Sequence, residues 1–173
     1  MNLKDKIADY PNFPKKGILF RDFSPILGDP SSLSFMVEEF SKKFHPNDVD
    51  VFAGIESRGF IMAGALAYNL ETAFIPLRKP QKLPFKTHSV SYELEYGATD
   101  MHIHTDALDG HTNLLIIDDL LATGGTVIAA LDLIKKFQDK EVVGAGFVIN
   151  LPELGGHTKL ENLGVESKYL LEF

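Results

Sequence analysis

Short uninterrupted apolar runs are the main feature of the hydrophobic pattern, and most of them are followed by a loop and a helix. Such runs, bounded by turn residues, predict buried strands, and they lie at Val51–Ile55, Thr72–Leu77, Asn113–Ile117, Val142–Asn150 and Tyr169–Phe173. Strands that are apolar throughout are typical of a parallel sheet covered on both faces. The pattern therefore predicts an α/β fold with a largely parallel central sheet flanked by helices.

Apolar residues at intervals of three and four predict the helices. Asp29 followed by Pro30 is typical of a helix start, and the next apolar residues share one face as far as Phe44, just before the Pro46–Asn47 turn. Phe60–Leu70 and Gly125–Phe137 are predicted as further helices. The first ten residues show the same spacing, so a short helix is expected there that ends at Pro11.

Two stretches do not follow this alternation. Residues 11–25 mix Gly, Pro and basic residues, and they predict an ordered loop with a short extended piece. Lys79–Ser91 carries three lysines and two prolines without usable periodicity, and long connections of this kind often act as functional lids. Beyond it, Ser91–Tyr96 and Asp100–His104 flank Gly97 and predict a hairpin.

Composition and charge narrow the function. At 173 residues the chain is expected to form one domain, residues 1–173. A net charge of -7 argues against a nucleic-acid partner, and no apolar segment is long enough to span a membrane. The absence of cysteine excludes disulfides, thiolate nucleophiles and Cys-ligated metals. The charged N-terminus shows no signal sequence, so a cytoplasmic location is expected.

The most informative stretch is LLIIDDLLATGGT, Leu114–Thr126. A buried strand is expected to end at the adjacent carboxylates Asp118 and Asp119, and the Thr-Gly-Gly-Thr turn then opens a helix. Backbone amides at a helix N-terminus bind phosphate, whereas carboxylates suit hydroxyl groups and hard cations. A ligand with a phosphate at one end and a polyol or magnesium nearby satisfies both, and ribose 5-phosphate has this form.

A purely structural interpretation of this run is that Asp118 caps the helix and that Gly124–Gly125 is only a tight turn. Two other phosphate motifs are excluded by inspection, because the chain has no GxxxxGK[ST] and the glycines lack GxGxxG spacing. ATP hydrolysis and dinucleotide-dependent redox chemistry are therefore disfavoured.

The distribution of arginine points to further anion binding. The chain has three arginines, Arg21, Arg58 and Arg78, and arginine suits planar recognition of phosphate better than lysine. Arg58 follows a predicted strand in GIESRGF, where small residues let backbone amides face an anion. Arg21 has an alternative role, since it is able to pair with the adjacent Asp22.

The Leu114–Thr126 run resembles the phosphoribosyl pyrophosphate (PRPP) motif of the type I phosphoribosyltransferases. Four further segments resemble the adenine phosphoribosyltransferase family in the same order: FPKKGILFRDFSPIL (13–27), GIESRGF (54–60), PLRKPQKLP (76–84) and YELEYG (92–97). The resemblance covers nearly the full length. It implies transfer of the 5-phosphoribosyl group from PRPP to N9 of adenine, giving AMP and pyrophosphate in purine salvage.

The resemblance also implies an architecture and partners. A small hood is expected from about residues 1–30, and a flexible catalytic loop from about 79–97. Mg²⁺ is the implied cofactor, held mainly by the substrate and with Asp118 or Asp119 as its protein contact. A homodimer is expected.

Site roles follow residue by residue from the same resemblance. Asp118 and Asp119 hold the ribose hydroxyls, directly or through Mg²⁺ and water. The residues expected to cradle the 5-phosphate are Ala122, Thr123, Gly124, Gly125 and Thr126. Those expected to bind pyrophosphate are Arg58, Arg78, Lys79 and Lys82, and a cis peptide is implied at Glu56–Ser57.

The base and the reacting centre have their own implied residues. Leu19, Phe20 and Arg21 form the adenine-binding piece, in which backbone groups recognise the 6-amino edge and a side chain packs on the ring. A site matched to an amino group would leave its polar groups unpaired against a 6-oxo purine. Glu95 is the implied catalytic residue, although Glu93 shares its strand parity and sequence alone does not separate them.

Some positions depart from the family pattern or stay open. Gln81 and Phe85 stand where relatives often have glycine, which puts the behaviour of the loop in question. His102 and His104 share a strand face, but without a third ligand an exposed face is favoured over a metal site. The alternatives are a 6-oxopurine phosphoribosyltransferase and a non-catalytic PRPP-sensing regulator.

Overall fold

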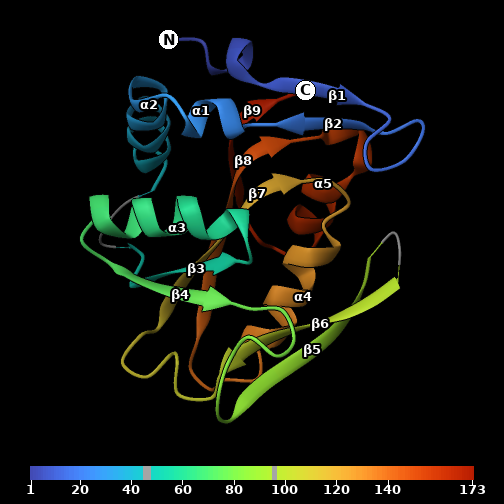
Figure 1. Cartoon of the computed structure of the whole chain (residues 1–173). Coiled ribbons are helices and arrows are strands. Elements are labelled where there is room, and N and C mark those ends of the chain that lie inside the picture. The colour runs from blue at the N-terminus through green and yellow to red at the C-terminus, as the bar shows by residue number, and fades with distance from the viewer. Residues whose placement is uncertain (45–47, 95–96) are drawn as a thin grey trace.

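Five parallel strands form the central sheet of the computed structural model, which describes residues 1–44, 48–94 and 97–173 (Figure 1). Their order is β4-β3-β7-β8-β9, and their bounds are β3 Val51–Ile55, β4 Ala73–Leu77, β7 Asn113–Leu121, β8 Glu141–Asn150 and β9 Ser167–Glu172. The predicted α/β fold and its five strands are confirmed. The strand β7 continues four residues beyond the predicted end at Ile117.

The sheet separates two hydrophobic cores. One face is covered by α2 (Pro30–Ser41) and α3 (Arg58–Asn69), and the other by α4 (Gly125–Ile134) and α5 (Gly156–Asn162). Within β3, alternate side chains serve the two cores, which is why this strand is apolar throughout. The short α5 was not predicted, because only Gly156 and Leu160 among its seven residues are buried.

The N-terminal segment that the resemblance implies to be a hood, called the hood below, lies at one end of the molecule (Figure 1). It contains a 3₁₀ turn (Leu3–Lys6), the antiparallel strands β1 (Ala8–Pro11) and β2 (Leu19–Asp22), and α1 (Ser24–Leu27). The predicted N-terminal helix is wrong beyond Lys6. Residues 8–11 pair with β2 instead, and the mostly exposed strand β1 carries too few buried positions to show a strand period.

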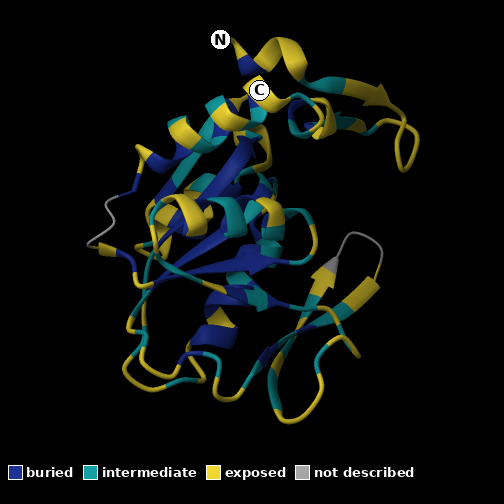
Figure 2. Ribbon diagram, turned by 60° about the vertical axis from the view of Figure 1, so that its left-hand side comes forward, coloured by how far each residue is buried: buried dark blue, intermediate teal, exposed yellow. Residues whose placement is uncertain are grey.

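A second hairpin projects from the other end, and in Figure 2 both hairpins extend to the same side. It joins β5 (Thr87–Leu94) to β6 (Gly97–His104) in antiparallel register. The predicted hairpin is confirmed but begins earlier, inside the stretch predicted as a loop. Its half-buried Val90 and Tyr92 alternate with exposed Ser89, Ser91 and Glu93, and both pack against the core beside α4.

The connection between β4 and β5 contains the two positions, 81 and 85, at which relatives often have glycine, and its backbone shows why glycine suits them. Gln81 and Phe85 both have φ of 63°, a left-handed conformation that glycine adopts without steric cost and other residues rarely adopt.

Among the described residues, no helix is both long and apolar enough to cross a bilayer.

Candidate active site

Several of the predicted site residues, among them Arg58, Asp118 and Asp119, gather where the strand order of the sheet reverses. From β3 the chain passes through α3 to β4 on one side, whereas from β7 it passes through α4 to β8 on the other. Ligands of open α/β sheets bind at the carboxyl ends of the strands at such a point. GIESRGF spans the end of β3 and the start of α3, and the Ala122–Thr126 loop follows β7, so both lie at this position.

The Ala122–Thr126 loop leads into the N-terminus of α4. Gly124 has φ of 84° and caps this helix without a side-chain hydrogen bond, so no capping side chain takes the amides of the first turn. A helix N-terminus with open amides is suited to an anion. A cavity of about 220 Å³ is lined by this loop and its neighbours, namely Arg58, Asp118, Asp119, Leu120, Leu121, Ala122, Thr123, Gly124, Gly125, Thr126, Val127 and Phe147.

The carboxylates of Asp118 and Asp119 lie within β7, not after its end as predicted. The structural interpretation of Asp118 as a helix cap is wrong, because Gly124 occupies that position. Burial and the neighbouring Asp119 carboxylate raise the pKa of Asp118 well above its ordinary value. Burial also raises the pKa of Tyr92, with a further contribution from the charge of Asp118. Tyr92 is therefore a neighbour of the site that the sequence analysis did not single out.

Arg58 begins α3 and reaches across to β7. Its Nη2 lies 2.6 Å from Asp119 Oδ2, and its Cζ lies 5.2 Å from the centroid of the Phe20 ring in the hood. Gly59 makes this approach possible, since a Cβ there would lie 2.7 Å from the carbonyl oxygen of Ile117. Arg58, predicted to bind pyrophosphate, is thus paired with Asp119, predicted to bind the ribose. The sequence does not indicate this contact.

Glu56 organises the other basic loop. Its Oε2 accepts hydrogen bonds from Arg78 Nε and from the Lys79 backbone amide, both at 2.9 Å, and these contacts lower the pKa of the Glu56 carboxyl. The Glu56–Ser57 peptide is cis, as the resemblance implied. Lys79 and Lys82 are exposed.

The hood supplies the predicted base-binding residues. Leu19 is exposed, whereas Phe20 is half-buried and packs edge-on against Phe13 with centroids 5.2 Å apart. The suggested pairing of Arg21 with Asp22 is not found. Arg21 Nη1 instead donates to both carboxylate oxygens of Asp9 at 3.1 Å, because β1 and β2 place these residues opposite each other.

Glu95 lies outside the described residues, so its predicted catalytic role stays a prediction. The alternative Glu93 is described and exposed. Lys159 on α5 was not singled out from the sequence, yet its Nζ donates to the Thr123 carbonyl at 2.9 Å. Nothing in the linear pattern indicates this contact, because α5 reaches the loop only through the fold.

His102 and His104 are half-buried, so the favoured exposed face is not found. His102 Nδ1 lies 3.1 Å from Thr87 Oγ1, and its backbone pairs with that of Arg78. No group of three or more potential metal ligands occurs among the described side chains. The carboxylate pair at the cavity thus suits a cation only when other ligands come from elsewhere.

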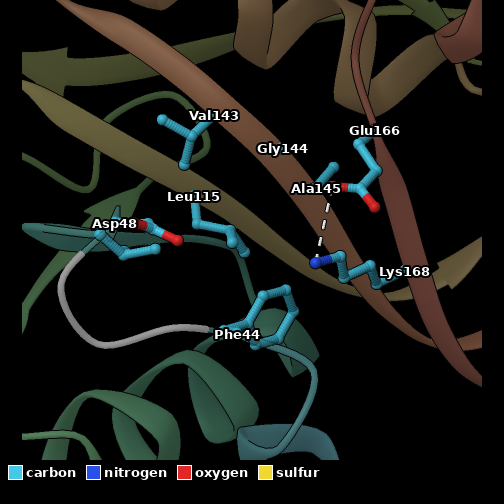
Figure 3. Close-up of a pocket in the computed structure, with 9 residues that line it drawn as sticks. Phe44, Asp48, Leu115, Val143, Gly144, Ala145, Glu166 and Lys168 are labelled. Atoms are coloured by element: carbon cyan, nitrogen blue, oxygen red, sulfur yellow. Dashed lines mark ion pairs between the residues drawn. The ribbon is translucent and has the colours of Figure 1, made fainter.

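A second pocket, of about 280 Å³, lies at the amino ends of the strands (Figure 3). Its walls include Phe44, Leu115 and Val143, and Lys168 Nζ lies 3.5 Å from Glu166 Oε2 at its rim. Its carboxylates, Asp48 and Glu166, are far apart in the chain, and the pocket lies at the end of the sheet opposite the Ala122–Thr126 loop. The cavity at the carboxyl ends is therefore the better candidate.

Comparison with known proteins agrees with this geometry. Residues 33–159 match the phosphoribosyl transferase domain family. An adenine phosphoribosyltransferase of Nitrosopumilus maritimus is 56% identical over 156 residues, which are 90% of this chain and 91% of the relative. The crystal structure of adenine phosphoribosyltransferase from Thermoanaerobacter pseudethanolicus superposes with a TM-score of 0.91 at 41% identity, covering 99% and 98% of the two chains.

A third similar protein is described in complex with two ligands. The adenine phosphoribosyltransferase of Saccharomyces cerevisiae, complexed with an imino-altritol bisphosphate and adenine, has a TM-score of 0.87 at 34% identity and covers 98% of this chain and 95% of its own.

With the switch-point cavity and these similarities together, the chain belongs to the phosphoribosyltransferase family and has its type I fold. Within that family it groups with the adenine phosphoribosyltransferases, the enzymes of purine salvage.

Proposed function

We propose that the cavity at the ends of β3 and β7 binds PRPP and that its 5-phosphoribosyl group is transferred there to N9 of adenine, with AMP and pyrophosphate as products. The observation that carries this proposal is the carboxylate pair beside a helix N-terminus that no side chain caps. The Ala122–Thr126 amides would hold the 5-phosphate, and Asp118 with Asp119 would accept hydrogen bonds from the ribose hydroxyls.

The basic loops supply the leaving-group site in this proposal. Arg58, Arg78, Lys79 and Lys82 would stabilise the negative charge that develops on pyrophosphate as the bond to C1 breaks. Glu56 acts as a positioning residue for this group, because it holds Arg78 and the Lys79 amide. The hood closes the site over the base with Leu19, Phe20 and Arg21, and Glu95 assists at the purine.

Mg²⁺ fits the same cavity as a substrate-borne ion. Magnesium in such sites is held by one or two carboxylates together with substrate oxygens and water, and Asp118 and Asp119 provide that number. When bound, it would neutralise pyrophosphate charge. We also place this activity in the cytoplasm, since a multiply charged sugar phosphate does not cross an apolar bilayer unaided.

A homodimer is part of the proposal, and α3 offers a face for it. Ile61 and Tyr68 on α3 are 44% and 90% exposed, and Phe74 on the edge strand β4 is 37% exposed. Gly64 lies on the same helix, and a Cβ there would meet nothing within 4 Å. A mid-helix glycine costs about 0.5–1 kcal/mol relative to alanine, so close approach of a second helix would explain its presence.

Formation of AMP from adenine and PRPP tests this function, with Mg²⁺ present and removed by a chelator. We expect turnover only with Mg²⁺. Asp118→Asn and Asp119→Asn should each lower kcat/KM for PRPP by about 10- to 100-fold, since hydrogen bonds to charged groups contribute about 1.5–3 kcal/mol. Asp132→Asn is the matched control, because Asp132 pairs with Lys135 on the surface of α4. Full activity in both site variants would contradict the assignment.

A further inference from the structure

Arg58 contacts two parts of the site that belong to different substrates in the proposed function. Its guanidinium is paired with Asp119, whose side chain is only 12% exposed, and it also lies over the ring of Phe20. Asp119 belongs to the ribose and phosphate cavity, whereas Phe20 belongs to the hood. A single side chain therefore joins the PRPP part of the site to the adenine part.

The contact of Arg58 with Phe20 limits the space that is left for a base on the Phe20 ring. A guanidinium that touches Asp119 and Phe20 together lies between the cavity and the hood, so it covers the face of Phe20 that is turned toward the cavity. In the proposed function, adenine packs on Phe20 and reacts at ribose C1 in the cavity, so its ring would approach Phe20 from the side that Arg58 covers. While it contacts Asp119 and Phe20, Arg58 thus competes with a base for this part of the Phe20 ring.

Pyrophosphate is well suited to remove Arg58 from this position. It offers several anionic oxygens, and a planar guanidinium binds two oxygens of a phosphate group bidentately. Asp119 is not left without partners, because ribose hydroxyls donate hydrogen bonds to a carboxylate. The exchange keeps both charged groups compensated, which a simple breaking of the ion pair would not do.

We infer that Arg58 couples the two substrate subsites: it covers Phe20 while it pairs with Asp119, and it uncovers Phe20 when the pyrophosphate group of PRPP binds it. This inference rests on the proposed function, and it gives Arg58 a role beyond holding the leaving group. Each substrate then raises the affinity for the other, because coupling between two binding sites is reciprocal.

Calorimetric titration of adenine into the enzyme without PRPP tests this inference. Arg58→Ala should bind adenine about two- to fivefold more tightly than the wild type, since no cation has to leave the aromatic face, even though its turnover falls. Saturating magnesium pyrophosphate should raise the adenine affinity of the wild type by a similar factor and leave that of Arg58→Ala unchanged.

Lys168→Ala is the matched control, because Lys168 lies over the ring of Phe44 and not over that of Phe20; its adenine affinity should equal that of the wild type. Arg58→Gln serves as a second variant if thermal unfolding shows that Arg58→Ala does not fold. Unchanged or weaker adenine binding in a folded Arg58 variant would overturn the inference. If the wild type binds hypoxanthine and not adenine, the proposed function fails instead.

Discussion

The carboxyl of Asp118 is a residue of the site whose ionisation lowers the stability of the folded chain. Burial and Asp119 raise its pKa, so ionisation of Asp118 is less favourable in the folded chain than in the unfolded one. The resulting loss of stability begins near the ordinary pKa of aspartate, about 3.9, and grows until the pH passes the raised pKa of Asp118. Above that pH it stays constant.

Asp118→Asn should therefore stabilise the ligand-free protein at neutral pH while it impairs PRPP binding. Each 1 kcal/mol gained would raise Tm by about 2–4 °C at this chain length. Thermal unfolding between pH 4 and pH 8 checks the sign, since the gain must shrink toward pH 4, where both proteins carry a neutral side chain. A variant that is less stable than the wild type at pH 7 would show that the Asp118 charge is compensated.

Gly59 is required by the distance between α3 and β7. A Cβ at this position would lie 2.7 Å from the Ile117 carbonyl oxygen and 3.1 Å from Asp118 Cα, and neither backbone atom moves easily. Gly59→Ala should lower the free energy of unfolding by about 1–3 kcal/mol and raise KM for PRPP. Chemical denaturation measures the first effect. Ser57→Ala, at an exposed position before the same helix, should change stability by less than about 0.5 kcal/mol.

At the scale of elements, the β4–β5 connection holds two residues in a conformation that suits glycine. Phe85 has φ of 63° and a side chain that is 96% exposed, so its ring contributes little packing to offset a conformational cost of about 1–2 kcal/mol. Phe85→Gly should match or exceed the wild type in the free energy of unfolding, whereas Phe85→Val should lower it by about 1 kcal/mol. Equal destabilisation by the two substitutions would mean that the Phe85 ring makes stabilising contacts that both of them remove.

The exposed face of α3 makes the dimer testable. Tyr68→Asp places a charge on the face of α3 that also carries Ile61 and Gly64, and burying an unpaired charge is strongly unfavourable. Sedimentation should show a dimer for the wild type and a monomer for this variant. Leu163→Asp, at a position 54% exposed beyond the end of α5, should remain dimeric. A dimeric Tyr68→Asp would place the interface elsewhere.

Elements with strong periodicity were predictable, and those with few buried residues were not. The strand β3 has all five residues buried, so its apolar run is unambiguous. The strand β1 buries none of its four residues fully, and it forms because β2 is available to pair with it. Such pairing depends on tertiary structure, which a local pattern does not contain.

For the whole molecule, the sequence predicted which residues gather at the site better than how they contact one another. Asp118, Asp119, the Ala122–Thr126 loop and Arg58 line one cavity, because they lie at or just beyond the carboxyl ends of the parallel strands β3 and β7. The ion pair of Arg58 with Asp119 and the bond from Lys159 to Thr123 were not predictable. Both depend on the spacing between elements that are distant in sequence.

The ratio of kcat/KM for adenine to that for hypoxanthine, each with PRPP and Mg²⁺, tests the central claim most directly. A site whose buried polar groups match a 6-amino edge should reject the 6-oxo purine by about 10⁴-fold, so we predict AMP formation with negligible IMP. Preferred turnover of hypoxanthine would contradict the account.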